Sequence, residues 1–515
     1  MDKFFRTNSS ILVERLDPSF YQPRLVENDK LIKSKGWVEL QSLYEASGIG
    51  NTSAVERYYS EAADSIPYIS GKVIKSFNID LDGCQRISLD SHKNELTKST
   101  IRPTDVLVIR KGDMGNACVV SSEVNEANCS SEVIYLKMKA SSDPYYLVSY
   151  LNCDQGQKAF KRLGRGTIIP GVSLLDVPRL PIPKVSEFVQ KYIGDKVRQA
   201  ELLRAWAKRL ENRVQNFHSQ FIPDQMNLDF GKKTRKVSTD RMTERLDAHF
   251  YPGVVEQYLN THPRKFESLN ALTTAIYNGQ TQPESFEKFC EQITVANLSA
   301  SFIKGQPRKV SSPSKVDKLI KSHDILMCNA AHNKSYIGKE LTYVHTDKKL
   351  LPSTEVMTIR VNRDLLPASY VRTYLLSQLG YVKVQSTIRG ITAHSYPDDV
   401  ALLDIYIPEV ESNQKQQWFK QDELLVQAGC AVEFSQKLTS CAKTLVEALI
   451  EGQLTEQQLI QAQQALEDGD YSLDQAILSK LSAEGYAIEG ATPLFSDVDE
   501  LYSLLEDAAQ AEAEE

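Results

Sequence analysis

The sequence predicts an α+β protein in which two similar α/β domains follow one another, each completed by a long helix. Three observations predict this fold. A short motif and its neighbours recur along the chain, each half ends on an apolar strand flanked by prolines, and a helix with one apolar face follows each strand. At 515 residues the chain is also too long for a single hydrophobic core.

The repeat is clearest at the sequence Glu-Arg-Leu-Asp-x-x-Phe-Tyr, which begins at Glu14 and again, 230 residues later, at Glu244. Weaker matches at offsets of 224 or 225 residues follow in the same order: Tyr150-Leu151 with Tyr374-Leu375, Arg165-Gly166 with Arg389-Gly390, and Ile182-Pro183 with Ile407-Pro408. Because both order and spacing are kept, we expect the two halves to share one fold.

Within each half the pattern is mixed. Short strands separated by Pro, Gly and Ser precede a helix that begins near Pro144 or Pro367. A loop with glycine follows, and then the proline-flanked strand, PRLPIPKV in the first half and LLDIYIPEV in the second. These patterns predict one domain over residues 1–184 and another over 229–410, which opens with a basic connector at 229–244.

Two long helices are predicted, one over residues 185–228 and one over 411–454. In both, apolar residues step by three and four positions with charged residues between them, which is typical of a helix that packs lengthwise against another helix. The residues expected to pack are Ile193, Val197, Leu203, Leu210, Val214 and Phe217 in the first helix and Leu424, Ala428, Leu438 and Leu445 in the second. We therefore expect the two helices to pair.

Charge is distributed unevenly. The net charge of −7 argues, by itself, against a nucleic-acid partner. Residues 455–515, however, hold fifteen Asp and Glu residues against one lysine, so this stretch carries −14 and residues 1–454 carry +7. We expect an acidic helical C-terminal extension whose last residues, AAQAEAEE, are frayed or disordered. Its role is open between a DNA mimic, a dock for a partner subunit, which its apolar residues favour slightly, and a solubilising tail.

The eight cysteines are scattered, with no Cys-x-x-Cys pair and no histidine at ligand spacing, so we expect reduced structural thiols rather than disulfides or a metal site. The sequence has no run of about 18 apolar residues. The first twenty residues, MDKFFRTNSSILVERLDPSF, lack the apolar core and cleavage site of a signal peptide. These observations predict a cytoplasmic protein that does not bind a membrane.

Catalytic motifs are weak in this sequence. Asp143-Pro144-Tyr145-Tyr146 approaches the Asp-Pro-Pro-Tyr motif with which adenine methyltransferases hold the target amino group, but the second proline is missing. A helix N-cap followed by a proline at the first helical position accounts for the same residues. No glycine-rich cofactor loop and no paired-carboxylate nuclease pattern accompany the motif. The sequence therefore favours a protein without its own active site, metal or cofactor.

Basic and amide side chains gather in the loops between predicted strands. Lys and Arg neutralise phosphates, and Arg, Lys, Asn and Gln also bind base edges in the major groove, so these loops are candidates for contact with DNA. The candidates are Lys72, Lys75, Arg110, Lys111, Lys161, Arg162, Arg165 and Thr167 in the first half and Lys304, Arg308, Asn329, Lys334, Gln385, Arg389 and Thr392 in the second. An ordinary solvated surface is the better explanation for any one of them taken alone, whereas the two glycine-containing loops are the stronger candidates.

Together these residues resemble the specificity subunit of bacterial type I restriction-modification enzymes. The resemblance is carried by the duplicated ERLDxxFY, by IPYISGKVI and DVLVIRKGDMGNACVV, by GRGTIIPGVSLLDVPRLPIP and by the two long helices, over about residues 10–454. It implies two target recognition domains, each reading one half of a split double-stranded DNA sequence, on an antiparallel coiled coil. By the same analogy, His394 joins the candidate DNA contacts. In the second half MCNAAHNKSYIG replaces IRKGDMGNACVV, which fits two halves that read different bases.

The resemblance also implies partners. Two methyltransferase subunits that bind S-adenosylmethionine, and restriction subunits that use ATP and Mg²⁺ as motor and nuclease, would supply all the chemistry of a phage-defence complex. This chain would then be its non-catalytic DNA-recognition and scaffold subunit. The residues leave one alternative open, namely a scaffold of a defence complex whose duplicated domains bind proteins and not DNA. The modest charge of residues 1–454 favours that alternative.

Overall fold

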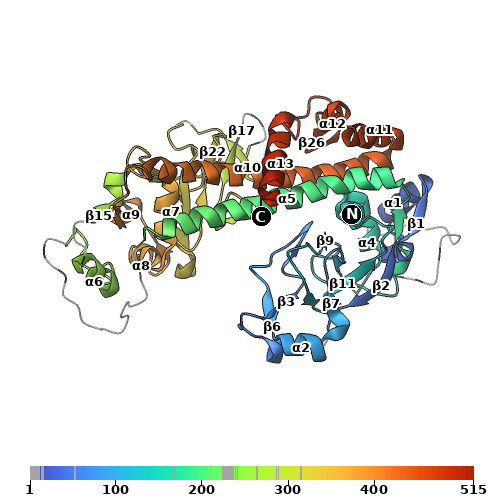
Figure 1. The fold of residues 1–515 in the computed structure, drawn as a ribbon, viewed down its shortest axis with the longest axis horizontal. Helices are drawn as coiled ribbons and strands as arrows, with labels where there is room; N and C mark the ends of the chain where they lie inside the picture. Colours follow the sequence, from blue (N-terminus) through green and yellow to red (C-terminus); the bar gives the residue numbers. More distant parts are fainter. Residues whose placement is uncertain are drawn as a thin grey trace. The chain divides into compact units, whose positions relative to one another are not determined.

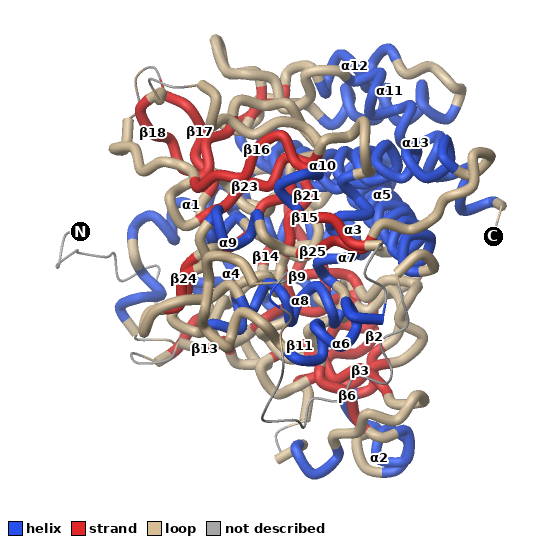
Figure 2. The backbone as a smooth tube through the Cα atoms, turned by 90° about the vertical axis from the view of Figure 1, so that its left-hand side faces the viewer, coloured by secondary structure: helices blue, strands red, loops and turns tan. Residues whose placement is uncertain are grey.

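The computed structural model describes residues 12, 15, 17–51, 54–166, 170–222, 237, 239, 242–261, 265–285, 287, 289–313 and 316–514. The chain forms two compact units (Figure 1). Unit 1 comprises Met1–Leu203 and Phe434–Glu515, and unit 2 comprises Arg204–Glu433. Figure 2 shows helices and strands in both units, which confirms the predicted α+β class.

Unit 1 is built on a four-stranded antiparallel sheet of order β2-β11-β8-β9. Its strands are β2 (Tyr44–Ile49), β11 (Val133–Met138), β8 (Val106–Ile109) and β9 (Ala117–Val119). All four residues of the apolar strand β8 are buried, as expected of a strand covered on both faces. A second sheet of order β6-β3-β10-β7 contains a parallel pair, β3 with β10. Its strands are β6 (Gln85–Ile87), β3 (Ile66–Ile69), β10 (Ala127–Cys129) and β7 (Thr100–Ile101).

Unit 2 has a sheet of the same kind, with order β16-β23-β19-β21 and all pairs antiparallel. Its strands are β16 (Thr273–Asn278), β23 (Val356–Val361), β19 (Ile325–Cys328) and β21 (Leu341–Tyr343). A three-stranded sheet of order β18-β17-β22 again contains a parallel pair, β17 with β22. Its strands are β18 (Arg308–Ser311), β17 (Phe289–Ile293) and β22 (Leu350–Pro352).

Some of the remaining elements of the two units correspond as well. The proline-flanked strand β14 (Pro181–Pro183) pairs with β1 (Trp37–Glu39), and β25 (Asp404–Tyr406) pairs in the same way with β15 (Phe266–Ser268). The other elements are α1 (Pro23–Ser34), β4 (Ile74–Lys75), β5 (Asn78–Ile79), α2 (Leu89–Asn94), β12 (Gly164–Arg165) and β13 (Gly171–Val172) in unit 1 and α6 (Gly253–Thr261), β20 (Ala330–Ala331), β24 (Ala393–His394) and α9 (Pro397–Ala401) in unit 2. The repeat seen in the sequence is thus a repeat of topology.

Two consecutive helices in each unit meet end to end. They are α3 (Pro144–Asn152) and α4 (Asp154–Arg162) in unit 1 and α7 (Ala368–Leu376) and α8 (Gln378–Ser386) in unit 2. Cys153 accepts a hydrogen bond from the Gly156 amide through its sulfur, and Ser377 accepts one from the Gly380 amide through its hydroxyl. Each side chain therefore satisfies an amide that the first turn of a helix leaves unpaired.

The two long helices are α5 (Glu187–Ser219) and α10 (Lys415–Glu451), and both units contain part of each. The residues predicted to pack are all buried except Phe217, which is half-buried. In unit 2 the Trp418 ring near the start of α10 lies 6.2 Å from that of His218 at the end of α5. In unit 1, burial raises the pKa of Cys441, toward the end of α10, and the charge of Lys196, near the start of α5, acts in the opposite direction. The helices therefore run antiparallel.

The acidic extension is folded and belongs to unit 1. It consists of α11 (Glu456–Glu467), α12 (Ser472–Leu478), a hairpin of β26 (Leu481–Ser482) and β27 (Gly485–Tyr486), and α13 (Val498–Ala513). The expectation that its end is frayed is wrong, because α13 continues to Ala513. Asp497 caps this helix, and Leu501, Leu504 and Ala508 bury one face of it. Three- and four-residue spacing, rather than acidic composition, decided the structure of this segment.

His218 lies in a closed aromatic cluster of unit 2. Its side chain is fully buried, and its Nε2 lies 2.9 Å from the hydroxyl oxygen of Ser369, with the rings of Tyr370 and Trp418 packed against it. Burial lowers the pKa of His218 to about 4, although the nearby Asp422 carboxylate acts in the opposite direction. The folded protein therefore holds this ring neutral at pH 5, where an exposed histidine is protonated.

We expect unit 2 to lose stability between pH 7 and pH 5 because of His218. A pKa that is lower in the folded state than in the unfolded state, about 4 against 6.5, favours folding above pH 6.5 and loses that contribution as the pH falls toward 4. The loss by pH 5 is roughly 2 kcal/mol. Urea denaturation at both pH values, for the native chain and for His218→Gln, measures it. An equal pH dependence in the two proteins would contradict the assignment.

Candidate nucleic-acid interface

In unit 1 the structure brings together two loops that the sequence singled out separately. Strands β12 and β13 form a hairpin, and the loop after β8 lies against it, because Lys111 forms a β-bridge with Gly171. The Val172 amide donates to the carbonyl oxygen of Arg110 at 3.0 Å, and the Nε of Arg110 donates to that of Val172 at 3.0 Å. The loop at residues 110–116 and the hairpin are therefore one surface.

Unit 2 repeats this arrangement. Strand β20, which follows β19, pairs with β24, so that Ala330 faces His394 across the ladder. The Ser395 amide donates to the carbonyl oxygen of Asn329 at 2.8 Å, and Arg389 and His394 close a tight hairpin of their own. In both units the arginine-glycine loop thus pairs with the loop after the central strand. We call this pair of segments the paired loops, residues 110–116 with 164–166 and 170–172, and residues 329–334 with 389–394.

Most of the candidate DNA contacts are exposed. They are Lys72, Lys75, Lys111, Lys161 and Arg165 in unit 1 and Lys304, Arg308, Lys334, Arg389 and Thr392 in unit 2. Lys75 lies in the hairpin of β4 and β5 and Lys72 just before it, whereas Arg308 begins β18 and Lys304 precedes that strand, so none of the four belongs to the paired loops. Thr167 lies outside the described residues.

Several of the candidates form bonds within the chain. Asn329 is buried, and its amide donates to the carbonyl oxygen of Thr354 at 3.0 Å. The Gln385 amide donates to the Lys334 carbonyl oxygen at 3.1 Å. Arg162 lies 3.0 Å from the Asp29 carboxylate. Arg110 holds the hairpin as described, and Arg308 donates to the side chain of Gln292 at 2.9 Å. Apart from Arg308, which is itself exposed, these side chains support the segments that carry the exposed candidates.

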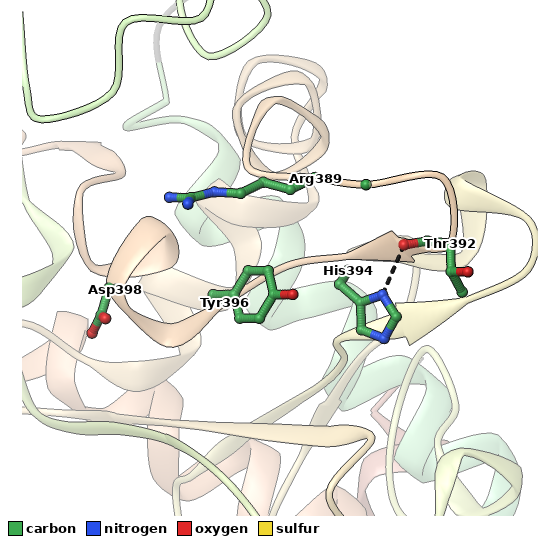
Figure 3. A pocket seen from close by; sticks show the side chains of 6 residues that line it. Arg389, Thr392, His394, Tyr396 and Asp398 are labelled. Carbon is green, nitrogen blue, oxygen red and sulfur yellow. Dashed lines mark hydrogen bonds between the residues drawn. The ribbon is translucent and has the colours of Figure 1, made fainter.

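The hairpin of unit 2 lines a shallow hollow of about 470 Å³, which Figure 3 shows with its lining residues Arg389, Gly390, Thr392, His394, Tyr396 and Asp398. The His394 ring stacks on the Tyr396 ring, with centroids 6.2 Å apart, and its Nδ1 donates to the Thr392 carbonyl oxygen at 2.7 Å. Ile391, at the tip of the hairpin, is fully exposed. A guanidinium, an imidazole and an apolar tip on one hairpin match the acceptors and the thymine methyl groups of a major groove.

Each of the two hairpin arginines is held by a carboxylate. Hydrogen bonding to the Asp176 carboxylate raises the pKa of Arg165, and hydrogen bonding to Asp399 raises that of Arg389. Sequence reasoning missed both aspartates, which lie 11 and 10 residues beyond the arginines that they bind. It also missed Ile391. The signal that was available is the recurrence of an aspartate at nearly the same distance from Arg-Gly in both halves.

Other functional readings gain nothing from the structure. Asp143 caps α3 by accepting from the amides of Tyr145 and Tyr146, at 2.8 and 3.2 Å, and it pairs with Arg198. This is the structural role that the sequence favoured over methyl transfer. The described part of the chain holds no cluster of three or more metal-ligating side chains. Within the same residues, no helix combines the length and the apolar character needed to cross a bilayer.

Comparison with known proteins gives structural matches only. No family model and no curated protein matches the chain. Among solved structures, the type I restriction-modification S subunit from M. genitalium matches with a TM-score of 0.42 and 14% identity, over 82% of this chain and 97% of that one. The HsdS subunit from Thermoanaerobacter tengcongensis matches with a TM-score of 0.27 and 16% identity, over 81% and 97%. The chain is similar to S subunits of type I restriction-modification systems.

A further match of this kind is a chain from a study of the assembly and conformational transition of a type I restriction-modification system. Its TM-score is 0.28 and its identity is 16%, over 81% of this chain and 98% of that one. At these values the neighbours transfer no residue roles to this chain. Its function has to be argued from its own paired loops and long helices.

Proposed function

We propose that this chain is a non-catalytic DNA-specificity subunit that binds a bipartite double-stranded site. One observation carries the proposal: two units of one topology each present the same pair of loops, with an exposed arginine on the hairpin and different side chains around it. Two units that share a fold but differ in the side chains of their loops are suited to two half-sites of different sequence. Phosphate contacts from the exposed lysines would position each unit, and the hairpins would contact base edges.

The long helices suit the role of a spacer. At 1.5 Å per residue the 33 residues of α5 span roughly 50 Å. One helical turn of B-DNA is roughly 35 Å long, so an antiparallel pair of this length matches two half-sites about one turn or somewhat more apart. Under this proposal the length of these helices sets the number of unspecified base pairs between the two half-sites.

The partners in this proposal are those that the resemblance to specificity subunits implies. Methyltransferase subunits that bind S-adenosylmethionine, and restriction subunits that use ATP and Mg²⁺, would act on the DNA that this chain recognises. Under this proposal the chain itself needs no cofactor. The long helices and the folded extension offer surfaces to such subunits, and the paired loops stay available for DNA.

Binding to a pool of duplexes with randomised bases, followed by sequencing of the bound fraction, tests the proposal. We expect a split motif, two short specified tracts separated by a gap of fixed length. If about six exposed lysines and arginines each neutralise one phosphate, affinity should fall roughly a thousandfold between about 50 and 200 mM salt. A continuous motif would contradict the two-unit reading, and a lack of any motif would contradict DNA recognition.

A protein-binding scaffold is the second candidate, favoured by the net charge of only +7 over residues 1–454. The same experiment separates the two, because a protein scaffold should not retain duplex DNA even at low salt. A chain lacking residues 455–515 is not a suitable control, since Asp474 of the extension forms a buried ion pair with α5. The full chain should therefore be used.

A further inference from the structure

In unit 1 the arginine of the repeated Glu-Arg-Leu-Asp motif reaches the exposed hairpin. The Arg15 side chain is 10% exposed, and its guanidinium donates to the carbonyl oxygens of Leu163 at 3.0 Å and Gly164 at 3.1 Å. The next residue is Arg165, whose Nε and Nη2 donate to the two carboxylate oxygens of Asp176 at 2.8 and 2.7 Å. Asp176 also lies 3.8 Å from Arg15, so one carboxylate stands between a buried arginine and an exposed one.

Unit 2 holds the same chain of contacts. The Arg245 side chain is 8% exposed and donates to the carbonyl oxygen of Thr387 at 3.1 Å. It lies 3.3 Å from the carboxylate of Asp399, which is 2% exposed. The same carboxylate oxygen accepts a hydrogen bond from Arg389, whose side chain is half exposed. A buried arginine, a carboxylate and an exposed hairpin arginine thus follow one another in both units.

The two arrangements arise from different local sequences. Asp176 stands just before a short 3-10 helix, whereas Asp399 lies inside α9, and the residues between each arginine and its aspartate differ in nearly every position. The buried arginine of each arrangement is nevertheless held in the same way, because the guanidinium of Arg15 or Arg245 lies 4.6 Å from the centroid of a phenylalanine ring of the motif. The two units therefore form the same arrangement from different local sequences. Two unrelated ion pairs on a solvated surface would have no reason to share it.

The carboxylate affects both the geometry of the exposed arginine and its net electrostatic attraction for other groups. An arginine that a carboxylate already holds loses less side-chain entropy when it binds, so its directional hydrogen bonds gain in value. At the same time the neighbouring carboxylate cancels most of its attraction for a phosphate. An arginine prepared in this way suits the two acceptors of a guanine in the major groove better than it suits the phosphate backbone.

We infer that Arg165 and Arg389 are the residues that contact base edges in each half-site, and that Arg15 with Asp176 and Arg245 with Asp399 are positioning residues for them. The inference rests on the proposed function and adds to it. It assigns a guanine in each half-site to one arginine, and it makes the arginine of the repeated Glu-Arg-Leu-Asp motif a support for the hairpin. The exposed lysines keep the task of binding phosphates.

The test uses the full chain, a pool of duplexes with randomised bases, and sequencing of the bound fraction. Asp399→Asn keeps the shape of the side chain and removes the charge that holds Arg389. We expect discrimination at one base pair of one half-site to fall about tenfold to hundredfold. The other half-site should be unchanged, and binding to unrelated duplex at low salt should be as strong or stronger, because a repulsive charge is gone. Asp176→Asn should do the same at the other half-site.

Two further variants sharpen the result. Arg389→Lys keeps the positive charge but lacks the planar guanidinium with its paired donors. It should therefore lose discrimination at the same base pair and keep its affinity for duplex at low salt. Asp364→Asn removes an exposed carboxylate elsewhere in unit 2 and should leave both half-sites unchanged. Unaltered discrimination in Asp399→Asn and Arg389→Lys would overturn the inference and leave the proposed function standing. Loss of a whole half-site together with a lower melting temperature would overturn it too, because the aspartate would then only hold the fold. If the native chain selected no motif, the proposed function itself would fail.

Discussion

Replacing Lys196 by methionine is expected to destabilise unit 1 by about 3–5 kcal/mol. The Lys196 ammonium lies 2.7 Å from Asp474, and the two side chains are 2% and 1% exposed. Tyr192 and Tyr502 donate to the same carboxylate at 2.5 and 2.6 Å. Without the ammonium the carboxylate keeps two hydroxyl donors but no opposite charge, inside a region from which water is excluded. Urea denaturation of the full chain measures the loss.

The pH dependence of this variant has a definite sign. Burial raises the pKa of Asp474, but the Lys196 charge and the hydrogen bonds more than offset it, so the pKa lies below its usual 3.8. In Lys196→Met burial dominates and the pKa should rise above that value. The folded variant then binds a proton more readily than the unfolded chain, and part of the lost stability should return as the pH is lowered toward 5.

Two controls isolate the buried pair. Lys191→Met removes a half-exposed lysine of the same helix that pairs with Glu467 of the same extension at 3.3 Å, and it should cost less than about 1 kcal/mol. Adding Asp474→Asn to Lys196→Met removes the unpaired charge and should restore most of the stability. A double variant no more stable than the single one would show that packing, rather than charge, holds the extension against α5.

Alanine at Gly156 or at Gly380 is expected to destabilise its unit by roughly 3 kcal/mol. A Cβ at Gly156 would lie 1.8 Å from the carbonyl oxygen of Tyr150, and one at Gly380 would lie 2.1 Å from that of Tyr374. In both cases the obstacle is the backbone of the preceding helix, which cannot rotate away. The first turn of α4 or α8 would have to separate from the last turn of α3 or α7. Melting temperatures of the two variants check this.

Gly194 is the matched control, since it also lies in a helix of unit 1. The atoms nearest to a Cβ there are the ends of two side chains rather than backbone, the capping Asp143 at 2.8 Å and its ion-pair partner Arg198 at 2.9 Å, and these must shift to make room. Alanine is the better helix former by about 1 kcal/mol, so Gly194→Ala should change stability little or raise it. If Gly156→Ala also raised stability, the close approach of the two helices would be wrong.

A large part of the fold was accessible from the sequence. The three- and four-residue spacing of apolar residues predicted both long helices, and the recurring motifs predicted two units with one topology. The cap at Asp143 was predicted with its proline, and the structure confirms it. The folded end of the extension was predicted wrongly, because acidic composition was given more weight than the spacing of Leu501, Leu504 and Ala508.

The candidate interface was accessible only in part. The sequence singled out the loop after the central strand and the arginine-glycine loop, yet nothing in either shows that β20 pairs with β24 or that Lys111 bridges to Gly171. The carboxylates that hold the arginines were missed as well, because the aspartate that recurs ten or eleven residues after each arginine lies in a segment without periodicity.

The sequence alone determined the duplication, the long helices and the acid-rich end, because spacing along an element follows from backbone geometry, 3.6 residues per helical turn and two per strand repeat. The tertiary structure decided which loops meet, which arginines are held and which face of the extension is buried. Those contacts join segments far apart in the chain. They depend on how loops close and strands pair, and local residue patterns do not encode this.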